Sequence, residues 1–391
     1  MTSIGQVRAA VVGTGFIGIV HVDALRRLGV EITGIVGSSP GRVREKARAH
    51  PLPEPYESFE AMLADPRVDV VHITSPNHLH FPQARAALEA GKHVVCEKPL
   101  GMDPAETAEL LRIAEDSGLV HAVNFNIRHY PLIREARERV AAGSLGDVRL
   151  ITGSYLQDWL LYDTDWNWRL EDDRGGALRA VGDIGSHWID LMTYVTGRHV
   201  EAVLAELTTF IPVRQRPVGP VETFSGGAGG ETVPVEIHTE DTASILLRFE
   251  GGARAAMTVS QLSPGRKNAL TFQIDGSESA VAWSGERPDE LWIGHRDRPN
   301  ELLFRDPSML TPAAAATVSV PGGHAEGFEN TFRELYRAVY RAVAAGGPPD
   351  EPDYPTFADG HEEALIGDAI AASAREGRWV TVERTTTTER A

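Results

Sequence analysis

The chain has 391 residues, of which 42% are hydrophobic and 24% charged, so we expect a globular protein with two domains and exclude overall disorder. The formal net charge is -17, and no basic stripe with interleaved aromatic residues occurs, which argues against nucleic acid as a partner. Without a signal-peptide pattern at the N-terminus or an apolar run of 18 residues, we expect no membrane association and a cytoplasmic location.

A glycine-rich turn follows the first predicted strand, residues 8–12. The turn, Gly13-Thr14-Gly15-Phe16-Ile17-Gly18, opens a helical pattern. A G-x-G-x-x-G sequence between a strand and a helix indicates dinucleotide binding. The first glycine permits the tight turn, the second lets the backbone approach a pyrophosphate, and the third lets the helix pack on the strand. The amides at the start of the helix would then receive the phosphate.

The second predicted strand, residues 31–36, ends where the cofactor's ribose is expected. NAD-selective sites usually place Asp or Glu there, but this chain has Gly37. Ser38, Ser39 and Arg42 follow and could donate hydrogen bonds to a 2′-phosphate. These residues favour NADP over NAD, although Arg42 could equally be a solvent-facing residue of the next helix.

Strands and helices alternate through the first 125 residues. This pattern predicts a doubly wound parallel sheet, a Rossmann domain spanning residues 1–125. Ser75, Pro76, Asn77 and His80 lie at a strand's carboxyl end, where ligands bind in such folds, so we expect them to contact the cofactor. No matching ligand motif accompanies the histidines, and we predict no metal site. The further expected helices are 58–64, 81–90 and 104–117, and the further strands are 68–74, 93–96 and 120–124.

The strand at residues 93–96 ends in Glu97-Lys98-Pro99. Lys98 therefore stands at the ligand-binding edge of the sheet and is a candidate for chemistry. The alternative is a solvated lysine at a strand exit. Cys96, the chain's one cysteine, lies within the apolar strand and is expected to be an inert core thiol.

From residue 126 onward the strands are separated by turns rather than helices, which predicts an α+β domain, 126–391, with a large, mainly antiparallel sheet. We expect a surface loop over residues 212–241, which are rich in Pro and Gly. The expected helices are 132–142, 326–343 and 356–376, and the expected strands are 147–159, 201–210, 242–249, 254–261, 270–275, 280–283 and 291–293.

Asp183 and His187 form a second candidate for chemistry. In a helix that starts near residue 184, Asp183, His187 and Asp190 would lie near one face. A carboxylate one turn away can fix the tautomer of an imidazole, and a histidine near a helix N-terminus tends to be neutral and able to accept a proton. The alternative is an Asp cap followed by a buried, hydrogen-bonded histidine.

Together these segments resemble the Gfo/Idh/MocA oxidoreductases over essentially the whole chain. Further segments carry the same resemblance: Asn126-Ile127-Arg128, Trp168-Arg169 and residues 359–379. The resemblance implies a Rossmann domain followed by an open sheet domain, with NAD or NADP and substrate meeting between them. It also implies a homodimer or homotetramer.

The resemblance also implies roles for individual residues. His187 would be the general acid/base, Lys98 would touch cofactor and substrate, and Asp183 would orient the substrate or His187. A second set is implied around them: Glu97, Trp168 and Arg169 as cofactor contacts, and Asn126 and Arg128 near the substrate. Tyr155, Gln157, Asp158 and Trp159 end the first sheet strand and could line a polyol pocket, and His324 precedes a helix that could bring it there.

The sequence thus predicts an NAD(P)-dependent dehydrogenase or reductase that acts on a secondary hydroxyl of a sugar, sugar derivative or cyclitol. One alternative is a glycosidase that keeps its NAD bound and oxidises the substrate transiently. Another is a catalytically silent ligand sensor of the same fold. The presence of Lys98, Asp183 and His187 argues against the sensor, which needs no acid/base set.

Overall fold

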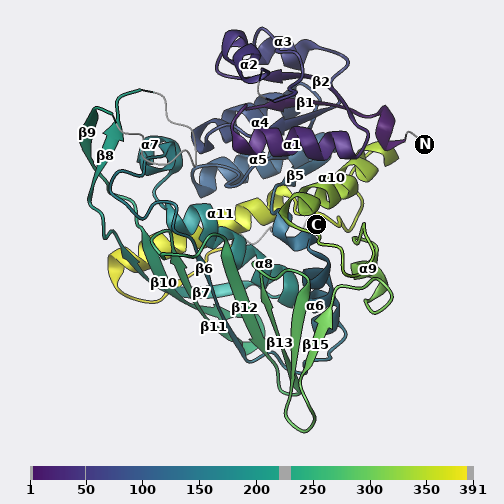
Figure 1. The fold of residues 1–391 in the computed structure, drawn as a ribbon, viewed down its shortest axis with the longest axis vertical. Helices are drawn as coiled ribbons and strands as arrows, with labels where there is room; N and C mark the ends of the chain where they lie inside the picture. The colour runs from purple at the N-terminus through teal and green to yellow at the C-terminus, as the bar shows by residue number, and fades with distance from the viewer. Residues whose placement is uncertain (1–2, 49, 220–229, 385–391) are drawn as a thin grey trace, which may run out of the picture.

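The computed structural model describes residues 3–48, 50–219 and 230–384, and it shows two sheets that lie in separate halves of the molecule (Figure 1). The first is a five-stranded parallel sheet in the order β2-β1-β3-β4-β5. This order confirms the predicted Rossmann fold. Its elements are β1 (Arg8–Val12), α1 (Phe16–Arg27), β2 (Glu31–Val36), α2 (Pro40–Lys46), α3 (Phe59–Ala64), β3 (Val70–Ile73), α4 (His80–Glu89), β4 (His93–Cys96), α5 (Pro104–Ser117) and β5 (His121–Val123).

The second half is built on a nine-stranded sheet in the order β15-β14-β13-β12-β6-β11-β10-β7-β16. All its pairs are antiparallel except β6 with β11. The large, mainly antiparallel sheet is therefore confirmed. Its strands are β6 (Leu150–Leu156), β7 (Val200–Thr208), β10 (Thr242–Phe249), β11 (Arg254–Ser260), β12 (Ala269–Asp275), β13 (Ser279–Ser284), β14 (Glu290–His295), β15 (Glu301–Phe304) and β16 (Val380–Thr381).

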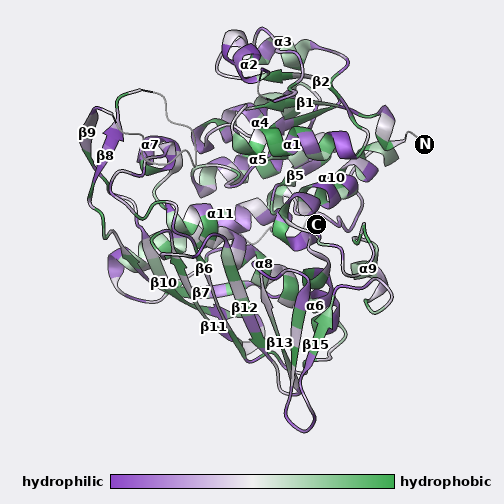
Figure 2. Ribbon diagram, in the orientation of Figure 1, coloured by the Kyte–Doolittle hydropathy of each residue, from purple (hydrophilic) through white to green (hydrophobic). Residues whose placement is uncertain are grey.

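Burial differs between the two sheets. The parallel sheet is covered on both faces, whereas the nine-stranded sheet is covered on one face. The four residues of β3 are all buried, whereas buried and exposed residues alternate along β10. Figure 2 shows hydrophobic and hydrophilic residues mixed along the strands of the second sheet. The helices of the second half are α6 (Pro131–Ala141), α7 (Asp172–Gly175), α8 (Ser186–Thr196), α9 (Pro312–Ala315), α10 (Phe328–Ala345) and α11 (Phe357–Glu376).

Two late helices connect the halves. Phe332, Tyr336 and Tyr340 of α10 belong to the same buried cluster as β1 and α1, so this helix packs on the Rossmann sheet. Helix α11 lies between the two sheets in Figure 1 and packs against both α5 and β7. The two halves are therefore joined by packed helices.

Part of the predicted surface loop, residues 212–241, is a two-stranded hairpin. Strands β8 (Val213–Pro217) and β9 (Thr232–Glu236) pair antiparallel, so the expectation of a loop is wrong for these residues. Pro217 ends β8 and Pro234 lies in the middle of β9, and prolines at such positions argue against a strand in the sequence. The glycine run that begins at residue 226 lies outside the described residues up to residue 229.

Neither a membrane span nor a metal cluster occurs within the described residues. None of their helices combines the length and apolarity needed to cross a bilayer. No group of three or more His, Cys, Asp or Glu side chains in the same ranges could hold a metal ion.

Candidate active site

One large cleft, with a volume of about 1640 Å³, runs from the glycine-rich turn to the face of the second sheet. Val12 ends β1 at the cleft, and Thr14, Gly15, Phe16 and Ile17 line it. Lys98, Asp183 and His187 line its other end. The structure thus brings the predicted cofactor turn and the predicted chemical residues to a single cavity.

The glycines of the turn fit the roles that the motif predicts. Gly13 has φ +113°, and a Cβ on it would lie 2.3 Å from Thr74 Oγ1. A Cβ on Gly18 would lie 2.3 Å from the Gly13 carbonyl oxygen, so both positions need close backbone packing. A Cβ on Gly15, in contrast, would meet no atom within 4 Å, and no side chain caps the start of helix α1. The first amides of α1 can therefore receive a dinucleotide pyrophosphate.

At the end of β2 the structure separates the residues predicted to hold the ribose. Ser38 lines the cleft, but Ser39 and Arg42 do not. The Ser39 hydroxyl caps α2 by accepting the Arg42 amide at 3.3 Å, and the Arg42 side chain is exposed to solvent. Lys46, one turn beyond Arg42, lines the cleft instead, and its Nζ donates to the Thr14 carbonyl at 2.9 Å. The expected placement of Ser39 and Arg42 is thus corrected.

The turn after β3 contributes Ser75, Pro76, Asn77 and His80 to the cleft. Asn77 Nδ2 donates to the Gly175 carbonyl at 2.8 Å and so links the Rossmann half to helix α7. The two ring nitrogens of His80 lie 2.6 Å from the Pro99 carbonyl oxygen and 2.8 Å from that of Ser75. His80 therefore holds together the turns that follow β3 and β4.

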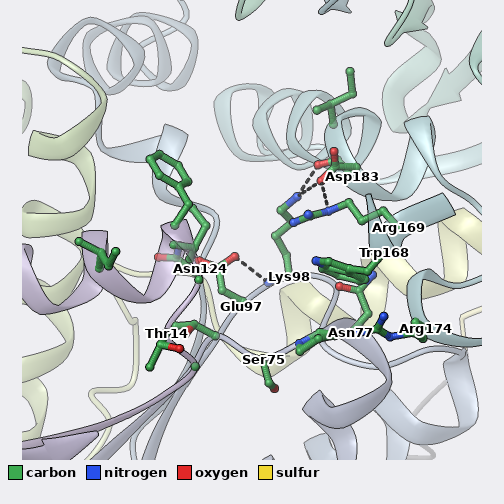
Figure 3. Close-up of a pocket in the computed structure, with 18 of the residues that line it drawn as sticks. Thr14, Ser75, Asn77, Glu97, Lys98, Asn124, Trp168, Arg169, Arg174 and Asp183 are labelled. Carbon is green, nitrogen blue, oxygen red and sulfur yellow. Dashed lines mark hydrogen bonds and ion pairs between the residues drawn. The ribbon is translucent and has the colours of Figure 1, made fainter. Parts of the chain in front are cut away.

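Lys98 and Asp183 meet in the cleft across the two halves of the molecule (Figure 3). Lys98 Nζ lies 3.2 Å from Asp183 Oδ1 and also donates to the Asp183 carbonyl. Arg169 Nε lies 3.0 Å from the same carboxylate, and Gln261 Nε2 donates to Oδ2 at 2.9 Å. Burial alone would raise the pKa of Asp183, but Arg169 and Lys98 outweigh it and lower the pKa to about 2. Asp183 is therefore a carboxylate with three donors around it.

His187 lies beside this cluster but is not bonded to it. It is the second residue of α8, and a π-helical turn, Val181–Gly185, precedes this helix. The regular α-helix therefore starts at residue 186, two residues later than expected. No hydrogen bond joins Asp183 to His187, and His187 Nδ1 is buried without a partner in the described part of the chain. The expectation that Asp183 fixes the tautomer of His187 is not met in this structure.

The protonation state of His187 is set by its surroundings. Burial, followed by the charge of Lys98, lowers its pKa to about 3. The ring packs edge-on against Phe125 at 5.8 Å between centroids and lies 6.4 Å from the ring of Tyr155. At neutral pH the imidazole is therefore neutral and can accept a proton.

This pKa gives a testable pH profile. We expect kcat/KM to show no loss from protonation of His187 between about pH 8 and pH 5, because its pKa in the free protein lies near 3 rather than 6.5. The pH dependence of kcat/KM for the sugar, with a saturating dinucleotide, reports the protonation of His187 in the protein–dinucleotide complex. An acid limb centred near pH 6.5 that disappears in His187→Gln would contradict the lowered pKa.

One wall of the cleft is polar and internally hydrogen-bonded. Trp159 Nε1 donates to Gln157 Oε1 at 2.8 Å, and Gln157 Nε2 donates to Asn268 Oδ1 at 3.2 Å. The Tyr155 hydroxyl donates to the same oxygen at 2.6 Å. Because an indole nitrogen can only donate, these bonds set the amide orientations and leave the Asn268 amino group for other acceptors.

Residues of the loop between β11 and β12 complete this wall. Lys267 Nζ lies 2.7 Å from Asp158 Oδ2, and both residues line the cleft with Asn268. Sequence reasoning missed Lys267 and Asn268 because no motif marks the loop. Asn126, Trp168 and Arg169 also line the cleft, as expected, and the Arg169 guanidinium stacks 4.4 Å from the Trp168 ring centroid.

Two predicted substrate residues are not brought to the cleft. Arg128 is buried in an ion pair, with its Nε 2.9 Å from Asp190 Oδ2 and its Nη2 2.7 Å from Asp359 Oδ1. His324 is exposed, with its Nδ1 3.3 Å from the Pro321 carbonyl oxygen. Arg128 therefore joins α8 to α11, and neither residue lines the cavity.

The fold and the cleft together define a dinucleotide-binding oxidoreductase. The comparisons with known proteins agree. Residues 7–125 match the model of the oxidoreductase family with an NAD-binding Rossmann fold, and residues 133–282 match the GFO/IDH/MocA C-terminal domain. The chain belongs to the GFO/IDH/MocA family of NAD-binding oxidoreductases.

Relatives with named activities cover nearly the whole chain. Levoglucosan dehydrogenase of Pseudarthrobacter phenanthrenivorans is 33% identical over 89% of this chain and 88% of its own. A structure of levoglucosan dehydrogenase with NADH and L-sorbose has a TM-score of 0.85 at 30% identity, covering 97% of this chain and 99% of that chain. An inositol dehydrogenase homologue from Azotobacter vinelandii with NAD+ has a TM-score of 0.82 at 26% identity, covering 96% and 97%.

Proposed function

We propose that the protein is a dehydrogenase or reductase that transfers a hydride between nicotinamide and a secondary hydroxyl of a sugar, sugar derivative or cyclitol. The convergence of Lys98, Asp183 and His187 at one end of a cleft that begins at the glycine-rich turn carries this proposal. The polyhydroxy compounds named for the relatives support the substrate class. The polar wall around Asn268 suits such compounds.

In the oxidative direction, His187 takes the proton of the substrate hydroxyl. Its neutral imidazole is suited to this step. The Lys98 ammonium contacts the same oxygen and stabilises the negative charge that develops as the proton leaves. Asp183 holds Lys98 in place and accepts a neighbouring substrate hydroxyl. A bound nicotinamide supplies the acceptor for the hydride that leaves the substrate carbon.

The adenosine end of the cleft supports NADP over NAD. Val36, Gly37, Ser38, Lys46 and His50 line it, and none of these is a carboxylate that would repel a 2′-phosphate. Lys46 adds a positive charge at this end. We propose that Lys46 and Ser38 contact the 2′-phosphate of NADP.

A substitution at Ser38 tests the nucleotide preference. We expect Ser38→Asp to weaken NADP binding by roughly tenfold or more and to change NAD binding much less, because the carboxylate repels the 2′-phosphate. Position 37 cannot carry the test, since a Cβ on Gly37 would lie 2.6 Å from Val43 Cγ2. Ser39→Asp, at the cap outside the cleft, is the matched control. Equal losses for the two nucleotides in Ser38→Asp would refute the placement.

The function itself is tested by following the absorbance of reduced nicotinamide. Purified protein is mixed with NAD or NADP and with a panel that includes levoglucosan, myo-inositol and D-xylose. A sustained signal with one compound supports the proposal and identifies the nucleotide. Tight dinucleotide binding without any signal would favour the glycosidase or the sensor instead.

A further inference from the structure

A buried chain of hydrogen bonds leads from helix α10 to the cleft. The Tyr340 hydroxyl lies 3.0 Å from His72 Nε2, and His72 Nδ1 lies 3.0 Å from His21 Nδ1. His21 Nε2 then lies 3.0 Å from Glu97 Oε1. Tyr340, His72 and His21 are completely shielded from solvent, and they come from α10, β3 and α1. Four segments far apart in the sequence therefore meet in one polar chain under the cleft.

The chemistry of the four groups gives the chain a direction. Burial, followed by the proximity of His21, lowers the pKa of His72 well below its usual value, so His72 is neutral. If its Nε2 carried the proton, the Tyr340 hydroxyl hydrogen would have no acceptor among the described residues. The Tyr340 hydroxyl therefore donates to His72, His72 Nδ1 donates to His21, and His21 Nε2 donates to Glu97.

Glu97, the last group in this chain of hydrogen bonds, accepts two further hydrogen bonds. Asn124 Nδ2 donates to Oε1 at 2.5 Å, and the Lys98 amide donates to Oε2 at 3.3 Å. Burial alone would raise the pKa of Glu97, but the hydrogen bond from His21, together with the positive charge of Lys98, outweighs it and lowers the pKa. The carboxylate still has 11% of its side chain exposed, and it lines the cleft next to Lys98 (Figure 3).

We propose that His21 and His72 are positioning residues that keep Glu97 ionised and fixed at the nicotinamide end of the cleft, and thereby favour the oxidised dinucleotide over the reduced one. The inference rests on the proposed function, which puts nicotinamide beside Lys98. The oxidised ring is a cation and the reduced ring is neutral. A fixed carboxylate at this end of the cleft therefore attracts the oxidised form selectively.

The test compares two substitutions of His21. In His21→Leu the donor to Glu97 is lost, whereas in His21→Gln an amide can replace it. Calorimetry measures the dissociation constants of the oxidised and reduced forms of the preferred dinucleotide, without any sugar. We expect His21→Leu to weaken the oxidised form relative to the reduced form by about tenfold. His21→Gln should stay within about twofold of the unmodified protein.

Two further variants separate this effect from a general loss of structure. His121→Leu removes a histidine of the Rossmann sheet that accepts a hydrogen bond from the Phe357 amide and has none with Glu97. We expect this variant to leave unchanged the ratio of the two dissociation constants, oxidised to reduced. Tyr340→Phe removes only the hydroxyl at the far end and keeps the packing, so it remains testable if His21→Leu does not fold. We expect it to shift the ratio in the same direction, by about twofold to threefold.

The outcomes distinguish the two proposals. If the unmodified protein binds neither form of either dinucleotide, the proposed function fails. If it binds both forms and the ratio is unchanged in His21→Leu, or in Tyr340→Phe where His21→Leu does not fold, the positioning role of the buried chain is overturned while the proposed function stands.

Discussion

Replacing His187 with alanine is expected to lower kcat by roughly 100-fold or more and to leave dinucleotide affinity within about twofold. The imidazole is the only neutral titratable base that we place at the substrate oxygen, so its loss leaves the hydroxyl proton to water. We expect the affinity to survive because we place the dinucleotide contacts mainly at the glycine-rich turn and at Ser75 to Asn77, which line the cleft. Steady-state kinetics and calorimetric titration measure the two quantities on the same preparation.

His361→Ala is the matched control for this experiment. His361 is a histidine of α11 whose Nδ1 lies 2.8 Å from the Thr107 hydroxyl, outside the cleft. We expect the His361→Ala variant to keep a near-normal kcat. If His187→Ala also turned over at a near-normal rate, His187 would have no part in proton transfer.

Lys98→Met is expected to lower kcat/KM by roughly 100- to 1000-fold, which is typical for loss of one donor to a developing oxyanion. Methionine keeps the length of the side chain and removes its charge. Asp183 retains Arg169 at 3.0 Å and Gln261 at 2.9 Å, so the carboxylate stays partnered and the protein is expected to fold. Kinetics together with the midpoint of urea unfolding separate lost chemistry from lost stability.

Lys92→Met provides the control from the opposite end of the same strand. Lys92 Nζ donates to the carbonyls of Asp65 and Val68, at 3.1 and 2.8 Å, and does not line the cleft. The Lys92→Met variant tests whether removing a lysine charge next to β4 is enough by itself to lower turnover. Equal kcat/KM in Lys98→Met and Lys92→Met would contradict the role of Lys98 at the reacting oxygen.

The Rossmann half was predictable because its signals are local. Each strand is a short apolar run. The glycine-rich turn was recognisable because two of its positions, Gly13 and Gly18, leave no room for a Cβ. Helix α5, Pro104–Ser117, was predicted to the residue because Asp103 caps its start and Gly118 ends it with φ +64°.

Features that depend on contacts between distant residues were not predictable. Nothing local shows that Arg128 pairs with Asp190 and Asp359 rather than facing a substrate. The same holds for Asn268, whose place in the cleft depends on the pairing of β12 with β6. It holds also for His21, whose two hydrogen-bond partners are His72 of β3 and Glu97, the residue after β4.

Some expectations stay predictions. The domain boundary at residue 125 is one of them, since α10 follows the second sheet in sequence but packs on the first. Assembly into a homodimer or homotetramer is another. The roles given to the cleft residues, and the preference for NADP, are likewise proposals that the experiments above address.

We propose above all that a hydride moves from a substrate carbon to nicotinamide and leaves the protein with it. The most direct test uses the active compound from the absorbance screen with deuterium on its oxidisable carbons, followed by mass spectrometry of the dinucleotide released into solution. We expect one deuterium in each reduced nicotinamide formed. Label that stays in the sugar, or that returns to it with cleavage of a glycosidic bond, would contradict net hydride transfer to nicotinamide.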